Sequence, residues 1–148
     1  MKLEFKDYEV YDAKDKILGR LASTVAKQIL NGKNIVIINA EGAVISGDKK
    51  GIRERYRVRL NLRDMANPEH SPYWPRRPDM LVKRIIRGMV PYRQPKGKAA
   101  YDRLRVFMGV PEEVKAKTPI EIKTKAPKNL YTDHVTVGEL SKLLGYNK

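Results

Sequence analysis

The side chains best suited to chemistry in this chain are arginines, and they are concentrated in its middle. Twelve of the thirteen arginines lie in residues 51–110, which carry 15 Lys and Arg against 5 Asp and Glu. Residues 1–50 carry 9 against 7, and residues 111–148 carry 7 against 5. Because the planar guanidinium group grips phosphate oxygens in pairs and stacks on bases, this distribution indicates a polyphosphate partner, with nucleic acid first.

Alternate positions in residues 52–62 carry four arginines: Arg53, Arg55, Arg57 and Arg59. A period of two is typical of a strand with one basic face, whereas Ile52, Tyr56 and Leu60 at a spacing of four indicate a helix. We favour the helix, because Asp48 can cap its amino end. These arginines could form an ordinary solvated face, but acidic residues scarcely offset them, so we favour binding.

A proline-rich segment follows in residues 67–79. Proline fixes its own backbone and removes a donor, so we expect an extended loop. Within it Tyr73 and Trp74 stand beside Arg76 and Arg77, a combination that suits stacking on unpaired bases and clamping of phosphates. Trp74 could instead pin the loop to the core, and both interpretations stay open.

Asp79 predicts the start of a helix that runs to about Met89. The apolar side chains fall on one arc of its helical projection: Leu81, Val82, Ile85, Ile86 and Met89. The opposite arc carries Lys83, Arg84 and Arg87, and the loop that follows adds Arg93, Lys96 and Lys98. Three cations on one helical face predict a compact phosphate-binding stripe.

The elements that position this stripe begin with a strand–helix–strand unit. Apolar residues at spacings of three and four predict a helix over residues 18–30, ended by Gly32. The β-branched run at residues 35–38 predicts a strand covered on both faces, and we expect another strand near residues 7–11. This order implies a parallel pair crossed by the helix, which indicates the α/β class.

Gly42 and Gly47 resemble a phosphate-binding loop only in part. Such a loop needs lysine directly after the second glycine, whereas Asp48 takes that position here and would repel phosphates. We therefore predict a strand, a turn and a helix here. As a separate expectation, the chain has no catalytic residue, cofactor or metal. A nucleotide-binding α/β enzyme that uses the Gly42/Gly47 loop stays an alternative, and so does a free-standing RNA-binding regulator.

The carboxyl-terminal part is less informative. A helix near residues 97–104 and a strand over residues 105–108 are expected to return the chain to the sheet. Residues 111–133 lack periodicity and predict a surface excursion. Thr136 with Glu139 predicts a capping box for a last helix with Leu140, Leu143 and Leu144 on its apolar side.

The composition fits one globular domain. The chain has 148 residues, 41% of them hydrophobic, which is enough for one sizeable core. It has no cysteine and two histidines, which argues against thiolate and histidine-rich metal sites. Charges interrupt the apolar residues at the amino end, and no apolar run could span a membrane, so we expect a cytoplasmic protein with no membrane partner.

Four motifs in order resemble the universal L-thirteen family of large-subunit ribosomal proteins. They are YDAKDKILGRLASTVAKQILNGK at residues 11–33, IINAE at 37–41 with ISG at 45–47, RGMVP at 87–91, and LRVFMG at 104–109. Together they span roughly residues 8–110, and their order and spacing make the match specific. The proline-rich stretch at residues 71–78 is similar to the archaeal and eukaryotic branch, and the lack of cysteine favours an archaeal member.

The resemblance implies a three-layer α/β/α domain with a mixed, mainly parallel four-stranded sheet. We expect one domain over residues 1–148, with a near-neutral core at 7–47, an RNA-facing region at 51–110 and a variable part at 111–148. The resemblance also implies a structural, non-catalytic protein of the ribosome that binds large-subunit rRNA early in assembly, beside neighbouring ribosomal proteins. With the charge pattern, the expected RNA contacts are Arg76, Arg77, Lys83, Arg84, Arg87, Arg93, Lys96 and Lys98, then Arg53, Arg55, Arg57 and Arg59, with Tyr73 and Trp74.

Overall fold

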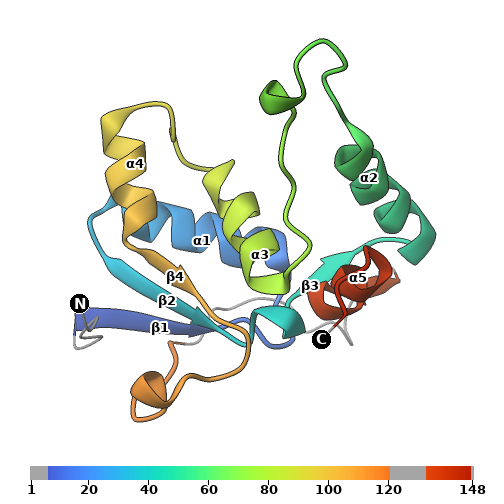
Figure 1. Cartoon of the computed structure of the whole chain (residues 1–148). Coiled ribbons are helices and arrows are strands. Elements are labelled where there is room, and N and C mark those ends of the chain that lie inside the picture. Colours follow the sequence, from blue (N-terminus) through green and yellow to red (C-terminus); the bar gives the residue numbers. More distant parts are fainter. Residues whose placement is uncertain (1–6, 121–132, 148) are drawn as a thin grey trace.

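A parallel sheet lies at the base of the molecule. The computed structural model describes residues 7–120 and 133–147. Within them, three strands pair in the order β1 (Tyr8–Asp12), β2 (Asn34–Ile38) and β4 (Leu104–Val106). Both pairings are parallel, as the strand–helix–strand pattern predicts (Figure 1).

The two remaining strands form a separate antiparallel pair. Strand β3 (Val44–Ser46) pairs with β5 (His134–Thr136), so that Ile45 faces Val135 in the register. The α/β class is confirmed, but the main sheet has three strands and not four. Instead of one mixed sheet, the described residues form two, because β3 and β5 pair with each other and with no other strand, apart from an isolated bridge between Val44 and Ile17.

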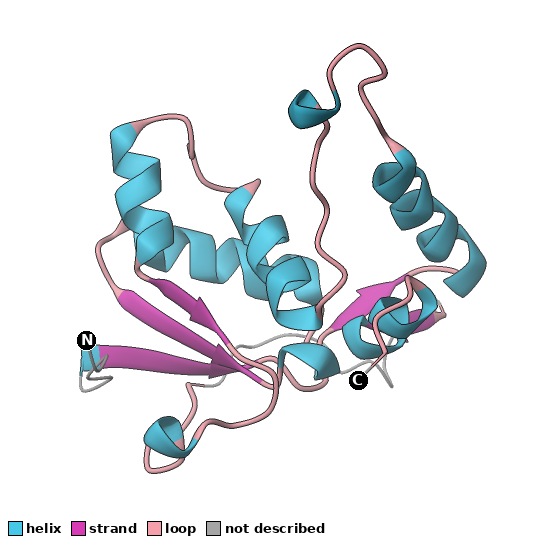
Figure 2. Ribbon diagram, in the orientation of Figure 1, coloured by secondary structure: helices cyan, strands magenta, loops and turns pink. Residues whose placement is uncertain are grey.

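Helices surround these strands in the order α1 (Leu18–Leu30), α2 (Lys49–Asn61), α3 (Pro78–Arg87), α4 (Pro95–Asp102) and α5 (Val137–Leu143). Figure 1 shows α1, α3 and α4 over one face of the three-stranded sheet, while α2 stands beside β3 and α5. The long connection from α2 to α3 contains only one short turn of 3-10 helix, at Pro68–His70. It is otherwise drawn as loop in Figure 2, as its prolines predict.

The α1 helix has the predicted bounds because its apolar stripe faces the sheet. Leu21, Val25 and Ile29 are completely buried, and Ile35 and Ile37 of β2 belong to the same core. The helix ends where Gly32 adopts a left-handed conformation, with a φ of 95°. A left-handed glycine ends helices at little steric cost.

The other face of the sheet carries a smaller apolar cluster. Val10, Val36 and Ile38 pack there against Val114, which belongs to a 3-10 turn at Glu112–Val114. In the part of the chain that the structure describes, this turn stands where the expected three-layer arrangement would put a second layer of helices. Residues 121–132 of the expected surface excursion, like the first six residues, lie outside the described ranges.

The turn between β3 and α2 differs from a phosphate-binding loop. Gly47 has a φ of 127°, which glycine adopts without strain. The side chain of Asp48 caps α2 by accepting a hydrogen bond of 2.9 Å from the amide of Gly51. A carboxylate thus takes the place at the helix amino end where a phosphate would bind. The helical interpretation of the alternate arginines is confirmed.

The α3 helix begins two residues earlier than predicted, with its amino-terminal cap at Arg77 and not at Asp79. Pro78 occupies its first turn, and Asp79 lies inside the helix instead of capping it. The reason is that proline, with its fixed φ and missing N–H, suits the first helical position. Leu81, Val82 and Ile86 are buried as predicted, but Met89 follows the end of the helix and is exposed.

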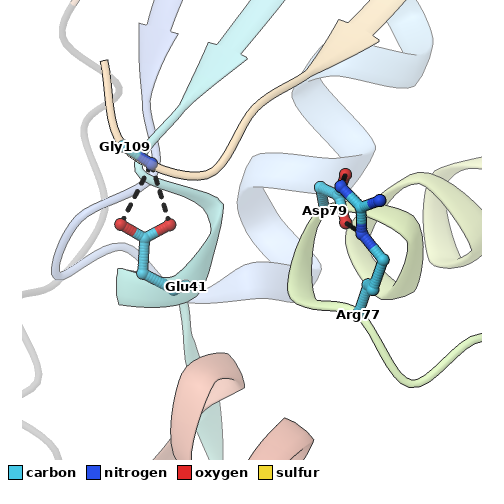
Figure 3. A network of polar contacts seen from close by, with 4 residues as sticks. All are labelled: Glu41, Arg77, Asp79 and Gly109. Atoms are coloured by element: carbon cyan, nitrogen blue, oxygen red, sulfur yellow. Dashed lines mark hydrogen bonds and ion pairs between the residues drawn. The ribbon is translucent and has the colours of Figure 1, made fainter. Parts of the chain in front are cut away.

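Hydrogen bonds between Glu41 and Gly109 fix the carboxyl end of the basic region to the core. The Glu41 carboxylate accepts hydrogen bonds of 3.1 and 3.2 Å from the amide of Gly109, just past β4 (Figure 3). Thr136 caps α5 by accepting a hydrogen bond of 3.2 Å from the amide of Glu139, which is one half of the predicted capping box. Among the residues described here, no helix is long and apolar enough to cross a membrane.

Candidate nucleic-acid interface

A first group of side chains, the tryptophan cluster, consists of Tyr56, Arg59, Trp74 and Arg84. Tyr56 and Arg59 lie three residues apart on α2 and therefore on the same side of the helix. The Trp74 ring meets the Tyr56 ring edge-on, with centroids 6.4 Å apart. The guanidinium carbons of Arg59 and Arg84 lie 4.9 and 5.0 Å from the Trp74 centroid. Trp74 thus joins the proline-rich loop to both α2 and α3.

A second group, the tyrosine cluster, consists of Lys83, Arg87, Tyr92 and Tyr101. The ammonium nitrogen of Lys83 lies 4.9 Å from the ring centroid of Tyr101, and the guanidinium carbon of Arg87 lies 4.7 Å from that of Tyr92. The two tyrosine rings meet edge-on at 5.2 Å. Every cation of the stripe, Lys83, Arg84 and Arg87, therefore contacts an aromatic ring.

These contacts orient the cations without neutralising them. A ring face attracts a guanidinium or ammonium group through its quadrupole but carries no net charge. Stacking leaves the donors at the edge of a guanidinium plane free to reach phosphate oxygens. Within the described ranges, neither Arg84 nor Arg87 forms an ion pair with a carboxylate. The stripe thus keeps its charge.

Partial burial changes the acidity of the groups in both clusters. Burial is the main cause that raises the pKa of Tyr56 and Tyr101. Burial also lowers the pKa of Lys83, assisted by the charge of Arg105, while Asp102 and Asp79 oppose the shift. A phosphate close to Lys83 would favour its protonated form, so binding and protonation would support each other.

Two hollows flank the stripe, and Arg84 and Arg87 line both of them. The Trp74 groove, about 540 Å³ in volume, is also lined by Trp74, Tyr92 and Arg93. The second hollow, which we call the Tyr73 groove, measures about 350 Å³. It is lined by Pro72, Tyr73, Pro75, Met80, Arg84, Arg87 and Tyr101. The two arginines can therefore meet an anion from either side.

Arg76 and Arg77 have different surroundings although they are adjacent. The Arg77 guanidinium donates hydrogen bonds of 3.2 and 2.9 Å to the two carboxylate oxygens of Asp79 (Figure 3). This pair offsets the charge of Arg77. The side chain of Arg76 is exposed and lines a hollow of about 330 Å³ with Arg53 and Arg57 of α2. Its carbonyl oxygen accepts a 2.6 Å hydrogen bond from the Ser141 hydroxyl, which fixes the loop to α5.

Comparison with known proteins identifies the family. The profile of the family described as Ribosomal protein L13 matches residues 6–113. The chain belongs to this family. It is 46% identical over 142 residues to the large ribosomal subunit protein uL13 of Archaeoglobus fulgidus, covering 95% of this chain and 89% of that protein. It is 44% identical over 137 residues to the uL13 protein of Methanosphaera stadtmanae, covering 92% and 96%.

Membership confirms the resemblance seen in the motifs, including its archaeal type. A third relative, the uL13 protein of Methanopyrus kandleri, is 40% identical over 145 residues, covering 95% of this chain and 89% of that protein. The family is one of structural proteins of the large ribosomal subunit and not of enzymes. This chain is therefore a structural ribosomal constituent.

The structure brings most of the candidate residues of this family member together but divides the arginines of α2. Arg59 lies on the rings of the tryptophan cluster, and Arg53 and Arg57 line the hollow beside Arg76. Arg55 lines another hollow, beside Ile17 and the β3 strand. Arg93, Lys96 and Lys98 are all exposed, and only Arg93 lines the Trp74 groove.

Sequence reasoning missed three tyrosines and two structural arginines. Tyr56 counted only as an apolar position of α2, and Tyr92 and Tyr101 were not considered. An aromatic residue three positions before an arginine on a helix, as Tyr56 is to Arg59, could have indicated the first of these contacts. Arg103 and Arg105 added to the charge count, but they donate hydrogen bonds to backbone carbonyl oxygens of Ile29, at 3.2 Å, and of Asp102, at 2.9 Å.

Proposed function

We propose that this ribosomal constituent binds large-subunit rRNA through the cation stripe of α3. The observation that carries the proposal is that Lys83, Arg84 and Arg87 each contact an aromatic ring rather than a carboxylate. Their orientation is thereby set before RNA arrives, which reduces the entropy that binding must overcome. Arg53, Arg57 and Arg76 extend the surface to the far side of α2.

Such a surface suits the backbone of folded RNA. Cations that approach phosphates release condensed counterions, which makes affinity fall steeply as salt rises. Double-stranded RNA is recognised chiefly by its shape and backbone, since side chains cannot read its deep and narrow groove. The spread of arginines over α2, α3 and the loops between them fits several phosphates of a folded RNA better than one small ligand.

Charge reversal of the stripe tests the proposal. The variant is Arg84→Glu/Arg87→Glu, and its binding to large-subunit rRNA fragments is measured over a series of salt concentrations. Each lost phosphate contact should make the dependence of log affinity on log salt less steep by about one unit or slightly less. The matched control is Lys27→Glu/Lys142→Glu, which reverses two exposed lysines on α1 and α5 and should keep the wild-type slope.

The neutral variant Arg84→Gln/Arg87→Gln distinguishes a loss of phosphate contacts from a loss of the fold. Thermal melting and circular dichroism should show that it is folded, and its slope should also fall. An unchanged slope in both stripe variants, or an equal loss in the lysine control, would contradict the proposal.

We further propose that the chain joins the large subunit early and contacts neighbouring ribosomal proteins there. Its resemblance to the family motivates this proposal. In sedimentation of cell lysate, the chain should move with large subunits and their early precursors after a moderate salt wash. A free-standing regulator would stay in the light fractions, and that result would reject the assembly role.

A further inference from the structure

Tyr73 and Trp74 are adjacent in sequence but have opposite environments. Trp74 is half-buried, and two guanidinium groups lie over its ring. Tyr73 is 83% exposed, although large aromatic side chains usually bury most of their surface. In extended backbone, successive side chains point to opposite sides, so fixing Trp74 against α2 turns Tyr73 towards solvent. The ring of Tyr73 is therefore the more accessible of the two to a ligand.

Two prolines restrict the backbone around Tyr73. Pro72 and Pro75 flank the aromatic pair, and each fixes its own φ angle. The Trp74 contacts with Arg59 and Arg84 hold the same stretch against two helices. An exposed ring on such a stretch has fewer backbone conformations to lose, so binding to it costs less conformational entropy.

The Tyr73 groove combines an aromatic face with unneutralised cations. Its loop side carries Tyr73 between two prolines, and α3 contributes Met80, Arg84 and Arg87. Met80 is 50% exposed and adds a flexible apolar contact. The two arginines rest on the rings of Trp74 and Tyr92, so their charge stays available. At about 350 Å³ the groove is in the size range of small-ligand sites.

We propose that the Tyr73 groove binds a single unpaired nucleotide that has left the stack of the RNA. The base stacks on Tyr73 and contacts Met80, while Arg84 and Arg87 hold the flanking phosphates. Stacking needs a free base face, which a paired and stacked nucleotide does not offer. This inference rests on the proposed rRNA binding and adds to it a preference for bulged or looped nucleotides over continuous duplex.

The test compares two RNA hairpins of equal length and charge. One carries a bulged 2-aminopurine, and the other has the same nucleotide paired. The wild-type protein should bind the bulged hairpin more tightly, and Tyr73→Ala should weaken that binding by about 5- to 100-fold while leaving the paired hairpin nearly unchanged. For the Tyr73→Ala variant, the slope of log affinity against log salt should equal the wild-type slope, since no phosphate contact is lost.

Two control variants identify the chemistry. Tyr73→Phe keeps the ring face and should bind the bulged hairpin like the wild type. Met65→Ala removes another exposed apolar side chain from the α2–α3 connection, one that is 90% exposed and does not line the groove, and it should also bind like the wild type. Equal melting temperatures of all three variants show that the fold is kept.

The outcomes separate this inference from the function on which it rests. If the stripe variants lose affinity and Tyr73→Ala binds both hairpins like the wild type, the groove does not hold a nucleotide while rRNA binding stands. If Tyr73→Ala weakens binding to both hairpins equally, the proposal that the Tyr73 groove holds an unpaired nucleotide is also wrong. If the wild-type protein binds neither hairpin nor any large-subunit fragment, both proposals fail.

Discussion

In residues 7–47 several charged side chains are held by an opposite charge or by hydrogen bonds, whereas in residues 51–110 several are held by aromatic rings. The Lys33 ammonium donates to the Glu9 carboxylate at 2.6 Å. Asp12 accepts from the side-chain amide of Asn39 at 2.9 Å. The stripe of α3 instead rests on Trp74, Tyr92 and Tyr101.

The difference shows how one small chain can be stable and still carry a large uncompensated charge. Ion pairs fix side chains but cancel their charge. Ring contacts, worth about 0.5–1 kcal/mol each at exposed sites, fix side chains and leave their charge intact. The core therefore supplies stability, and the basic region supplies oriented charge. The bidentate pair of Arg77 with Asp79 is an exception within the basic region.

The largest expected effect comes from a substitution in the hydrophobic core that leaves the basic region unchanged. Leu21→Ala leaves a cavity under α1, where Leu21 is completely buried, and should lower the free energy of unfolding by about 2–5 kcal/mol. Denaturant titration measures this loss. Below the melting temperature, the salt slope of RNA binding should equal the wild-type slope. A changed slope would mean that the two regions do not have separate roles.

A smaller effect is expected from a backbone contact inside the basic region. Gly97 of α4 is buried against the carbonyl of Pro91, and a Cβ there would overlap that carbonyl group. Gly97→Ala should destabilise the protein by about 1–3 kcal/mol, since neither backbone segment can move freely. Gly19→Ala on α1 is the control, because nothing lies near its added Cβ. Similar melting temperatures for the two variants would contradict the prediction.

Trp74→Leu tests the role of the rings directly. The change keeps an apolar side chain but removes the ring on which Arg59 and Arg84 rest. Stability should fall by about 1 kcal/mol through the lost cation–ring contacts, and RNA affinity should fall although no charge is removed. Calorimetry and RNA titration measure the two quantities. Undiminished affinity would show that ring contacts do not orient the arginines for binding.

The smallest effect is expected from the partly exposed ion pair between Glu9 and Lys33, which lies in the near-neutral region of residues 7–47. Glu9→Gln removes the pair with Lys33 and should cost less than about 1 kcal/mol. Burial first, and then the charge and hydrogen bond of Glu9, raise the pKa of Tyr11. The variant should therefore move the Tyr11 pKa down towards its ordinary value without reaching it. Spectrophotometric titration detects this shift, and an upward shift would refute the assignment of its cause.

The periodic elements were predictable because local pattern decides them. The bounds of α1 follow from its apolar spacing, and the helical form of α2 follows from Ile52 and Tyr56 together with the Asp48 cap. The separate β3–β5 pair was not predictable, since it joins strands far apart in sequence. Local pattern also could not show which aromatic ring meets which cation, because those contacts form between α2, α3, α4 and the loops.

The parallel pairing of β2 with β4 also sets an expected order of folding. Residues 39–103, which include the whole cation stripe, form one long loop between these two neighbouring strands. Closing such a loop costs chain entropy, whereas β1, α1 and β2 assemble from nearby residues. Amide protection in pulse-labelled refolding should therefore appear in α1 and β2 before it appears in β4. During synthesis, the near-neutral unit leaves the ribosome first and can be folded before the twelve arginines of residues 51–110 emerge.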